Sequence, residues 1–259
     1  MKISVITATY NSAQTVRDTF ESLLAQTYQD IECIVVDGAS KDGTLDIIRE
    51  FEPRFGGRMK WSSEPDKGIY DAMNKGLARA TGDVVGILNS DDFFTAPDIL
   101  EEVAKAFEAD NTLDAVYGDI HYCKWDDVTR PVRYYSSKGF RRWKMFIGYM
   151  PAHPSFYCRK QVYENYGYFD ATSFKVAADF ECVLRFIYIH RIKTRYIPRD
   201  FVTMREGGAS SSGAQSHLAI NRDHLLAFKK NGVRSNIVFL GVRYVFKIFE
   251  IIKSKIKYR

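Results

Sequence analysis

The chain of 259 residues has few cysteines, no long apolar run and none of the familiar glycine-rich phosphate motifs. Its four cysteines, Cys33, Cys123, Cys158 and Cys182, lie far apart, form no Cys-x-x-Cys pair and have no histidine at zinc-finger spacing. This pattern argues against a disulfide scaffold and against a structural zinc site. We therefore expect buried free thiols in a reducing, cytoplasmic environment.

Long hydrophobic segments are also missing. No run of about 18 uncharged apolar residues occurs, so the sequence predicts no membrane-spanning helix. Residues 3–7 are too short and too β-branched for the core of a signal peptide. Apolar residues still make up 46% of the chain, which is enough for the core of one large domain.

The glycines exclude three common kinds of site. No G-x-G-x-x-G follows the first predicted strand, and neither a P-loop nor a G-x-S-x-G elbow occurs. A phosphate ligand therefore needs another means of binding. Asp91 and Asp92 are candidates for holding a divalent cation, because Mg²⁺ prefers carboxylate and phosphate oxygens.

What the chain does have is an alternation of strands and helices in its first half. Strands are predicted at 2–9, 31–37, 59–62, 83–88, 115–122, 132–135, 193–197 and 201–205. Helices are predicted at 12–27 with Asn11 or Ser12 as N-cap, after Gly43, and at 69–80, 97–109, 176–190 and 214–230. This order predicts an α/β fold with a mostly parallel sheet and helices on both faces.

Polar and acidic residues follow the first four strands at the end where ligands bind such sheets. These segments are 7–11, 37–44, 63–68 and 89–92. Crowded carboxylates repel one another unless a cation or a donor-rich ligand lies among them. A single acid at one of these positions is explained by a turn or a helix cap. Four consecutive acidic or polar strand ends instead predict a ligand site.

At these segments the sequence resembles the family 2 glycosyltransferases with the GT-A fold, particularly bacterial enzymes of surface-polysaccharide synthesis. The resemblance rests on SVITATYN, VVDGASKDGT, SEPDKGIYDAMNKGLARATGD, GILNSDD, HPSFYCR, AADFECVLR and the GGAS loop. It covers residues 1–212 and implies a nucleotide-binding half (1–110) and an acceptor half (111–212).

The resemblance also implies roles for individual residues. Thr7, Thr9 and Asn11 would contact the nucleotide, Asp37 the nucleoside and Asp66 the base. Asn89, Asp91 and Asp92 match the acidic motif that binds the donor diphosphate through Mn²⁺ or Mg²⁺, although Asn89 stands where the family often has Asp. Asp179 matches the catalytic base, and Ala178 replaces the first acid of the usual pair.

Four further residues are candidates with ordinary structural alternatives. The resemblance suggests that His153 lines the sugar or acceptor pocket, while a lone buried histidine is the alternative. Glu181 is a second candidate on the acceptor side. Arg205 is a candidate for a contact with the diphosphate, because a guanidinium matches phosphate geometry. His217 is a candidate for a contact with the diphosphate or the metal. For Asp179, the alternative is an acid that favours a helix start.

The charge of the chain is concentrated at one end. Residues 229–259 contain nine Lys or Arg and one acid, so they carry +8, whereas the whole chain carries +5 and the other 228 residues −3. As a helix, 237–259 would have one face with Arg243, Lys247, Glu250, Ser254 and Lys257 and a broad apolar face. We expect 213–259 to be a helical extension whose basic tail lies on an anionic membrane. The alternative is a helix packed on the domain or in a homodimer.

The segment 138–150 is rich in aromatic and basic residues. It is either part of a membrane-facing surface or a packed helix. The sequence contains no recognisable nucleic-acid-binding module.

Together these features predict a metal-dependent, inverting glycosyltransferase. It would use a nucleotide-sugar donor and a lipid-linked or oligosaccharide acceptor, and would lie on the inner face of the cell membrane. Two other functions remain open from the sequence: a nucleotidyltransferase that makes sugar nucleotides, and a non-catalytic nucleotide-sugar-binding protein. The segment 7–11 lacks the Gly-rich basic loop that nucleotidyltransferases usually carry.

Overall fold

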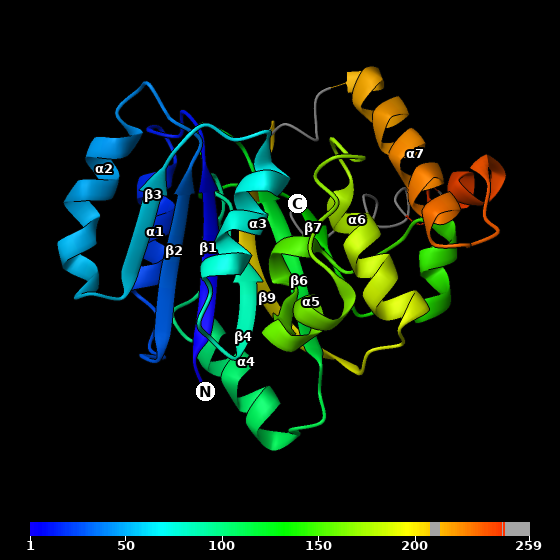
Figure 1. The fold of residues 1–259 in the computed structure, drawn as a ribbon, viewed down its shortest axis with the longest axis horizontal. Coiled ribbons are helices and arrows are strands. Elements are labelled where there is room, and N and C mark those ends of the chain that lie inside the picture. The colour runs from blue at the N-terminus through cyan, green and yellow to red at the C-terminus, as the bar shows by residue number, and fades with distance from the viewer. Residues whose placement is uncertain (208–212, 245, 247–259) are drawn as a thin grey trace.

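The computed structural model describes residues 1–207, 213–244 and 246 (Figure 1). In this part of the chain, a nine-stranded sheet forms the centre and helices cover both faces. The strands are β1 (Ile3–Thr9), β2 (Ile31–Asp37), β3 (Met59–Ser63), β4 (Val84–Ile87), β5 (Phe93–Phe94), β6 (Ala115–Cys123), β7 (Pro131–Tyr135), β8 (Tyr157–Arg159) and β9 (Thr194–Arg205). The α-helices are α1 (Val16–Leu24), α2 (Thr44–Phe51), α3 (Ile69–Arg79), α4 (Ile99–Ala109), α5 (Lys160–Tyr166), α6 (Ala178–Val183) and α7 (Gly213–Lys230). Shorter helical turns are η1 (Glu52–Phe55), η2 (Arg142–Ile147) and η3 (His153–Ser155), and η4 (Leu184–Ile189) is a π-helix.

The first half of the sheet is parallel, as predicted. Its strands stand in the order β3-β2-β1-β4, and every pair among them is parallel. All residues of β1 and β2 are buried, because helices cover both sides of these apolar, β-branched runs. The carboxyl ends of the four strands therefore meet at one rim, at the top of Figure 1.

The second half of the sheet, where the predicted alternation of strands and helices ends, is mixed. β8 pairs antiparallel with both β4 and β6, β7 pairs antiparallel with β6, and β5 with β9. Only β6 and β9 run parallel there. The strands predicted at 193–197 and 201–205 are one strand, β9, whose pairing with β6 shifts register around Asp119.

The helices divide between the two faces. Phe20 of α1, Phe51 of α2 and Phe107 of α4 belong to one buried cluster, whereas α3, α5, α6 and α7 pack on the other face. The predicted helix at 12–27 is shorter and begins at Val16, so neither Asn11 nor Ser12 is its N-cap. Asn11 instead adopts a left-handed backbone conformation with φ of 50°. The segment between β1 and α1 therefore belongs to the rim and not to the helix.

The C-terminal extension is helical and packs on the domain. Ala227 and Phe228 of α7, and Leu240 of the helical segment 237–244, are fully buried in the cluster that also contains Tyr70. The predicted divisions after residues 110 and 212 stay predictions, although this shared core joins their parts. The rest of the predicted basic tail, residues 245 and 247–259, lies outside the described residues. No helix in the described part combines the length and hydropathy needed to cross a membrane.

Candidate functional site

Asp37 holds three of the four loops at the rim together. It ends β2 and is completely buried. Its Oδ1 accepts hydrogen bonds from Thr9 Oγ1 at 2.9 Å and Ser40 Oγ at 2.5 Å, and its Oδ2 from the Ser40 amide at 2.9 Å and Ser63 Oγ at 2.6 Å. Burial alone raises the pKa of this carboxyl, but the four hydrogen bonds outweigh it and the pKa lies below its ordinary value.

An ionised carboxylate has about four acceptor positions, and all those of Asp37 are used inside the protein. The predicted contact between Asp37 and the nucleoside would therefore require one of these bonds to break. The geometry instead favours a clamp, in which Asp37 fixes the ends of β1, β2 and β3.

The segment after β1 is braced against its neighbours in the same way. The Asn11 amide donates to Ser40 Oγ at 2.8 Å, and Asn11 Oδ1 accepts from the Lys41 amide at 2.9 Å. Ser12 Oγ lies 2.8 Å from Ser90 Oγ, which joins this segment to the loop after β4. The predicted site residues Thr9, Asn11 and Asp37 are thus brought together in one polar network.

At one corner of the rim, Asp66 and the exposed Tyr10 ring lie against Gly38. Asp66 Oδ1 accepts the Gly68 amide at 2.8 Å. A Cβ atom placed on Gly38 would lie 2.5 Å from Asp66 Oδ2 and 3.3 Å from the Tyr10 ring, which is 64% exposed. The missing side chain at Gly38 therefore lets the Asp66 carboxylate and the Tyr10 ring lie close to its backbone. Gly38 and Tyr10 are not among the predicted site residues, although each directly follows one, Asp37 and Thr9 respectively.

The acidic segment after β4 contains two unlike carboxyl groups. Asp91 is partly exposed, whereas Asp92 is only 1% exposed and its two oxygens have no hydrogen-bond partner among the described residues. Burial, and then the neighbouring Asp91 charge, raise the pKa of Asp92 well above its ordinary value. Buried Thr7 Oγ1 and Asn89 Oδ1 also lack partners in the described part of the chain, so Thr7 shows no contact that defines its predicted role.

These residues fit a divalent cation through Asp91 rather than through Asp92. Burial raises the pKa of both carboxyls, so the difference between them is access: a cation needs an oxygen that it can reach, and only Asp91 is partly exposed. The described residues include no group of three or more metal-ligating His, Cys, Asp or Glu side chains. Asp91 would thus share a cation with diphosphate oxygens, an arrangement typical of Mg²⁺. The expectation of Asp92 as a second ligand is not favoured.

Arg205, which is predicted to contact the diphosphate, instead binds the backbone of the acidic segment. Its side chain is buried and forms an ion pair with Asp18, and Nη1 donates to the Asp91 carbonyl at 2.7 Å. The guanidinium also lies 5.2 Å from the centre of the Phe93 ring. A diphosphate contact would require Arg205 to leave these partners. His217 lies in α7, and its side chain is outside the described residues.

The acceptor half places Asp179 next to α3. Tyr70 Oη lies 3.1 Å from Asp179 Oδ1 and 2.7 Å from the Val176 carbonyl, so its single proton is shared between two acceptors. Burial and the Asp179 charge raise the pKa of Tyr70 well above its ordinary value, which keeps it a donor. Buried His153 packs edge-on against Phe169 at 5.7 Å between ring centres, and Phe169 also packs on Tyr70.

His153 lies close enough to Asp179 for their charges to interact. Burial lowers the pKa of His153, and the Asp179 carboxylate opposes this only in part. His153 is therefore a neutral side chain beside Asp179 at neutral pH. The structure thus brings these two predicted residues together.

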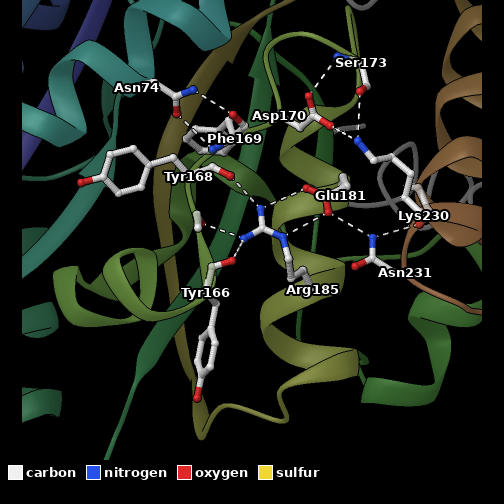
Figure 2. A network of polar contacts seen from close by, with 12 residues as sticks. Asn74, Tyr166, Tyr168, Phe169, Asp170, Ser173, Glu181, Arg185, Lys230 and Asn231 are labelled. Carbon is white, nitrogen blue, oxygen red and sulfur yellow. Dashed lines mark hydrogen bonds and ion pairs between the residues drawn. The ribbon is translucent and has the colours of Figure 1, made fainter.

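Glu181, by contrast, belongs to a buried structural network (Figure 2). Both of its carboxylate oxygens lie 3.1 Å from nitrogens of Arg185, and Asn231 Nδ2 donates to Oε1 at 3.0 Å. The remaining donors of Arg185 bind the carbonyls of Tyr166, Gly167 and Tyr168. Since Glu181 is occupied in this way, the geometry does not favour its predicted role at the acceptor.

The chain belongs to glycosyl transferase family 2, whose family model matches residues 4–167. It is 34% identical over 186 residues to an uncharacterized glycosyltransferase of Mycobacterium tuberculosis, covering 71% of this chain and 68% of the relative. It is 29% identical over 209 residues to a PGL/p-HBAD biosynthesis glycosyltransferase of Mycobacterium bovis, covering 81% of this chain and 78% of the relative.

Solved structures show the same fold. TarS (1–349) of S. aureus in complex with UDP-GlcNAc matches with a TM-score of 0.66 and 20% identity, covering 88% of this chain and 66% of that one. The mannosyltransferase PcManGT of Pyrobaculum calidifontis, in complex with GDP-Man and Mn²⁺, matches with a TM-score of 0.65 and 22% identity, covering 91% and 65%. This chain thus spans about two thirds of each structure. The predicted GT-A fold is confirmed, and the protein is a glycosyltransferase.

Proposed function

We propose that this glycosyltransferase moves a sugar, with inversion, from a nucleoside-diphosphate donor to a hydroxyl of a lipid-linked or saccharide acceptor. The observation that carries the proposal is the 3.1 Å contact between Tyr70 and Asp179. Tyr70 lies in the first turn of α3, directly after the loop that carries Asp66. A partly exposed carboxylate of the acceptor half is thereby held beside the nucleotide half.

The residues suit the two tasks of such a reaction. The acceptor oxygen attacks the anomeric carbon, the bond from that carbon to the diphosphate breaks, and the nucleoside diphosphate leaves. Asp179 accepts the proton of the acceptor hydroxyl, and attack from the face opposite the leaving group inverts the configuration. Tyr70 orients Asp179, and His153, whose pKa burial lowers, would add no competing charge near it.

On the donor side, Asp66 and the exposed Tyr10 ring beside it would receive the base. Asp91 would hold Mn²⁺ or Mg²⁺ together with the diphosphate, and such a cation supplies charge neutralisation for the leaving group. Arg205 and Asp37 keep the surrounding segments in place. The nucleotide sugars bound in TarS and PcManGT support a donor of this class, and the Mn²⁺ in PcManGT supports the cation.

The test is a screen of UDP-, GDP- and dTDP-sugars, scored by the nucleotide released with and without saccharide and glycolipid acceptors. Transfer, followed by NMR assignment of the product anomer, is the expected result. Release of no nucleotide from any donor would contradict the proposal and favour the non-catalytic alternative. Formation of a sugar nucleotide from a sugar phosphate and a nucleoside triphosphate would favour the nucleotidyltransferase instead.

A peripheral position on an anionic membrane suits a lipid-linked acceptor, and the described surface supports it. Trp143 of η2 and the helical residues Ile237, Val238 and Val242 are exposed. Phe239 packs on Phe146 with 4.8 Å between ring centres, so these two segments form one surface, which we call the η2/237–242 face. The PGL/p-HBAD biosynthesis relative also supports a glycolipid pathway.

Basic residues strengthen the membrane assignment of the η2/237–242 face. Each Lys or Arg near an anionic leaflet contributes about 1 kcal/mol, and residues 229–259 carry a net +8. The full chain should sediment with anionic vesicles and not with neutral ones. Replacement of Trp143, Ile237 and Val238 by Ser should weaken this binding. Trp125 is an exposed aromatic residue of another loop, so Trp125→Ser is the control and should leave the binding unchanged.

If the triple variant instead sediments like the parent, the membrane assignment of this face is wrong. Loss of a dimer in the variant, measured by analytical ultracentrifugation, would mean that a second copy of the chain covers the face. Truncation after Asn231 is a poor test, because it would also remove Leu240, which is fully buried in the core.

A further inference from the structure

The backbone just before the predicted base is held from two sides. From one side, Tyr70 Oη of α3 lies 2.7 Å from the Val176 carbonyl. From the other, Asp223 Oδ2 of α7 accepts the amides of Val176 at 3.0 Å and Ala177 at 3.1 Å. Three segments that are far apart in the sequence therefore meet at the start of α6.

The contact from Asp223 lies just before a helix that has no side-chain cap of its own. The first amides of a helix have no partner within the helix and are usually capped by a Ser, Thr, Asp or Asn side chain. The N-cap of α6 is Ala177, which has no such side chain. A buried carboxylate from α7 instead holds the Val176 and Ala177 amides, which lead into the helix, and its charge also favours the amino end of a helix.

The helix α7 is itself fixed on α6 along its length. The rings of His224 and Phe180 lie 3.8 Å apart, and Phe228 packs edge-on against Phe180 at 5.6 Å. At the far end, Asn231 binds Glu181, and Lys230 pairs with Asp170 (Figure 2). Asp223 is therefore placed by a rigid contact and not by a side chain that moves freely in solvent.

We propose that Asp223 is a positioning residue for Asp179, so that α7 is a working part of the acceptor site. Asp179 is the second residue of α6, and Asp223 fixes the two amides immediately before that helix. A general base has to lie within about 3 Å of its proton, and a shift of about 1 Å costs on the order of 100-fold in rate. This inference rests on the proposed role of Asp179 as base.

The test compares Asp223→Ala with Asp223→Asn. Both hydrogen bonds reach one oxygen, Oδ2, so the single amide oxygen of Asn is able to keep both. Asp223→Ala should lower kcat by about 10- to 100-fold, leave the KM for the donor unchanged, and speed hydrogen exchange of the 176–181 amides. Asp223→Asn should restore most of kcat. Lys230→Ala, which loses the contacts of α7 with Asp170, Ser173 and the Phe174 ring, is the matched control.

The inference is wrong if Asp223→Ala stays folded with parental kcat, or if Asp223→Asn is as impaired as the alanine variant. It is also wrong if Lys230→Ala lowers kcat equally, because any loosening of α7 would then suffice. Asp179→Asn separates the two proposals. Unchanged turnover in Asp179→Asn overturns the base itself, whereas a large loss there with none in Asp223→Ala overturns only the positioning role.

Discussion

Asp37 and Asp92 are buried carboxyl groups at the ends of strands in the same sheet, yet their surroundings favour opposite charge states. Asp37 accepts four hydrogen bonds and its pKa is lowered. Asp92 accepts none within the described residues and its pKa is raised. Burial alone therefore does not set the direction in which the pKa of a carboxyl shifts. The hydrogen-bond donors around the carboxyl also contribute to it.

The comparison divides the acids of the rim by task. Completely buried Asp37 holds loops together, and Asp92 is sealed from solvent with a raised pKa. Asp66, Asp91 and Asp179 are partly exposed and so remain available to a ligand. We therefore assign chemistry to the second group and structure to the first. The predictions below test this division.

The largest effect is expected for Asp179→Asn. The amide is nearly isosteric but cannot take up a proton, so kcat should fall by about 10²–10⁴-fold while the affinity for donor stays the same. Steady-state kinetics and calorimetry with the donor nucleotide measure the two quantities. A parallel loss of nucleotide affinity would place Asp179 on the donor side of the site and contradict the division.

Asp91→Asn should act on metal-dependent binding of nucleotide. With Mn²⁺ present, the affinity for UDP or GDP should fall by on the order of 10–100-fold, the cost typical of losing even a supporting group at a metal site. With a chelator present, parent and variant should bind alike. Calorimetry in both conditions provides the readout without relying on activity. Equal metal enhancement in the two proteins would show that Asp91 holds no cation.

Asp37→Asn should destabilise the fold rather than impair chemistry. An amide accepts fewer hydrogen bonds and adds unwanted donors, so the free energy of unfolding should fall by about 1–3 kcal/mol. A lowered pKa stabilises the fold above the ordinary carboxyl pKa and loses this effect as pH falls through the lowered value. The difference between parent and variant in urea unfolding should therefore narrow in acid. Asp46→Asn, at a side chain that is 82% exposed, is the control and should change little.

Much of this arrangement could be predicted from sequence because it depends on local pattern. The buried runs at 3–9 and 31–37, and the polar residues after them, predict the parallel strands and their common rim. The mixed half could not be read in this way, since the pairing of β6 with β7, β8 and β9 depends on contacts between distant segments. For the same reason, adjacent acids such as Asp91 and Asp92 look equivalent in sequence. Only their burial separates them.

The smallest effect on function is expected for Asp92→Asn, which most sharply separates Asp92 from its neighbour. A carboxyl whose folded pKa is raised stabilises the protein fully below the unfolded pKa and loses this contribution as pH rises toward the folded pKa. Asn undergoes no such loss, and unpartnered Asn89 Oδ1 offers its amide an acceptor. At neutral pH the variant should melt at the same temperature as the parent or higher, and below about pH 4 any gain should vanish.

Metal-dependent affinity for UDP or GDP should also be unchanged in Asp92→Asn. If Asp92→Asn instead lowers that affinity as much as Asp91→Asn does, then Asp92 is an ionised ligand that opens to the cation, and the contrast between sealed and exposed acids fails at this strand end.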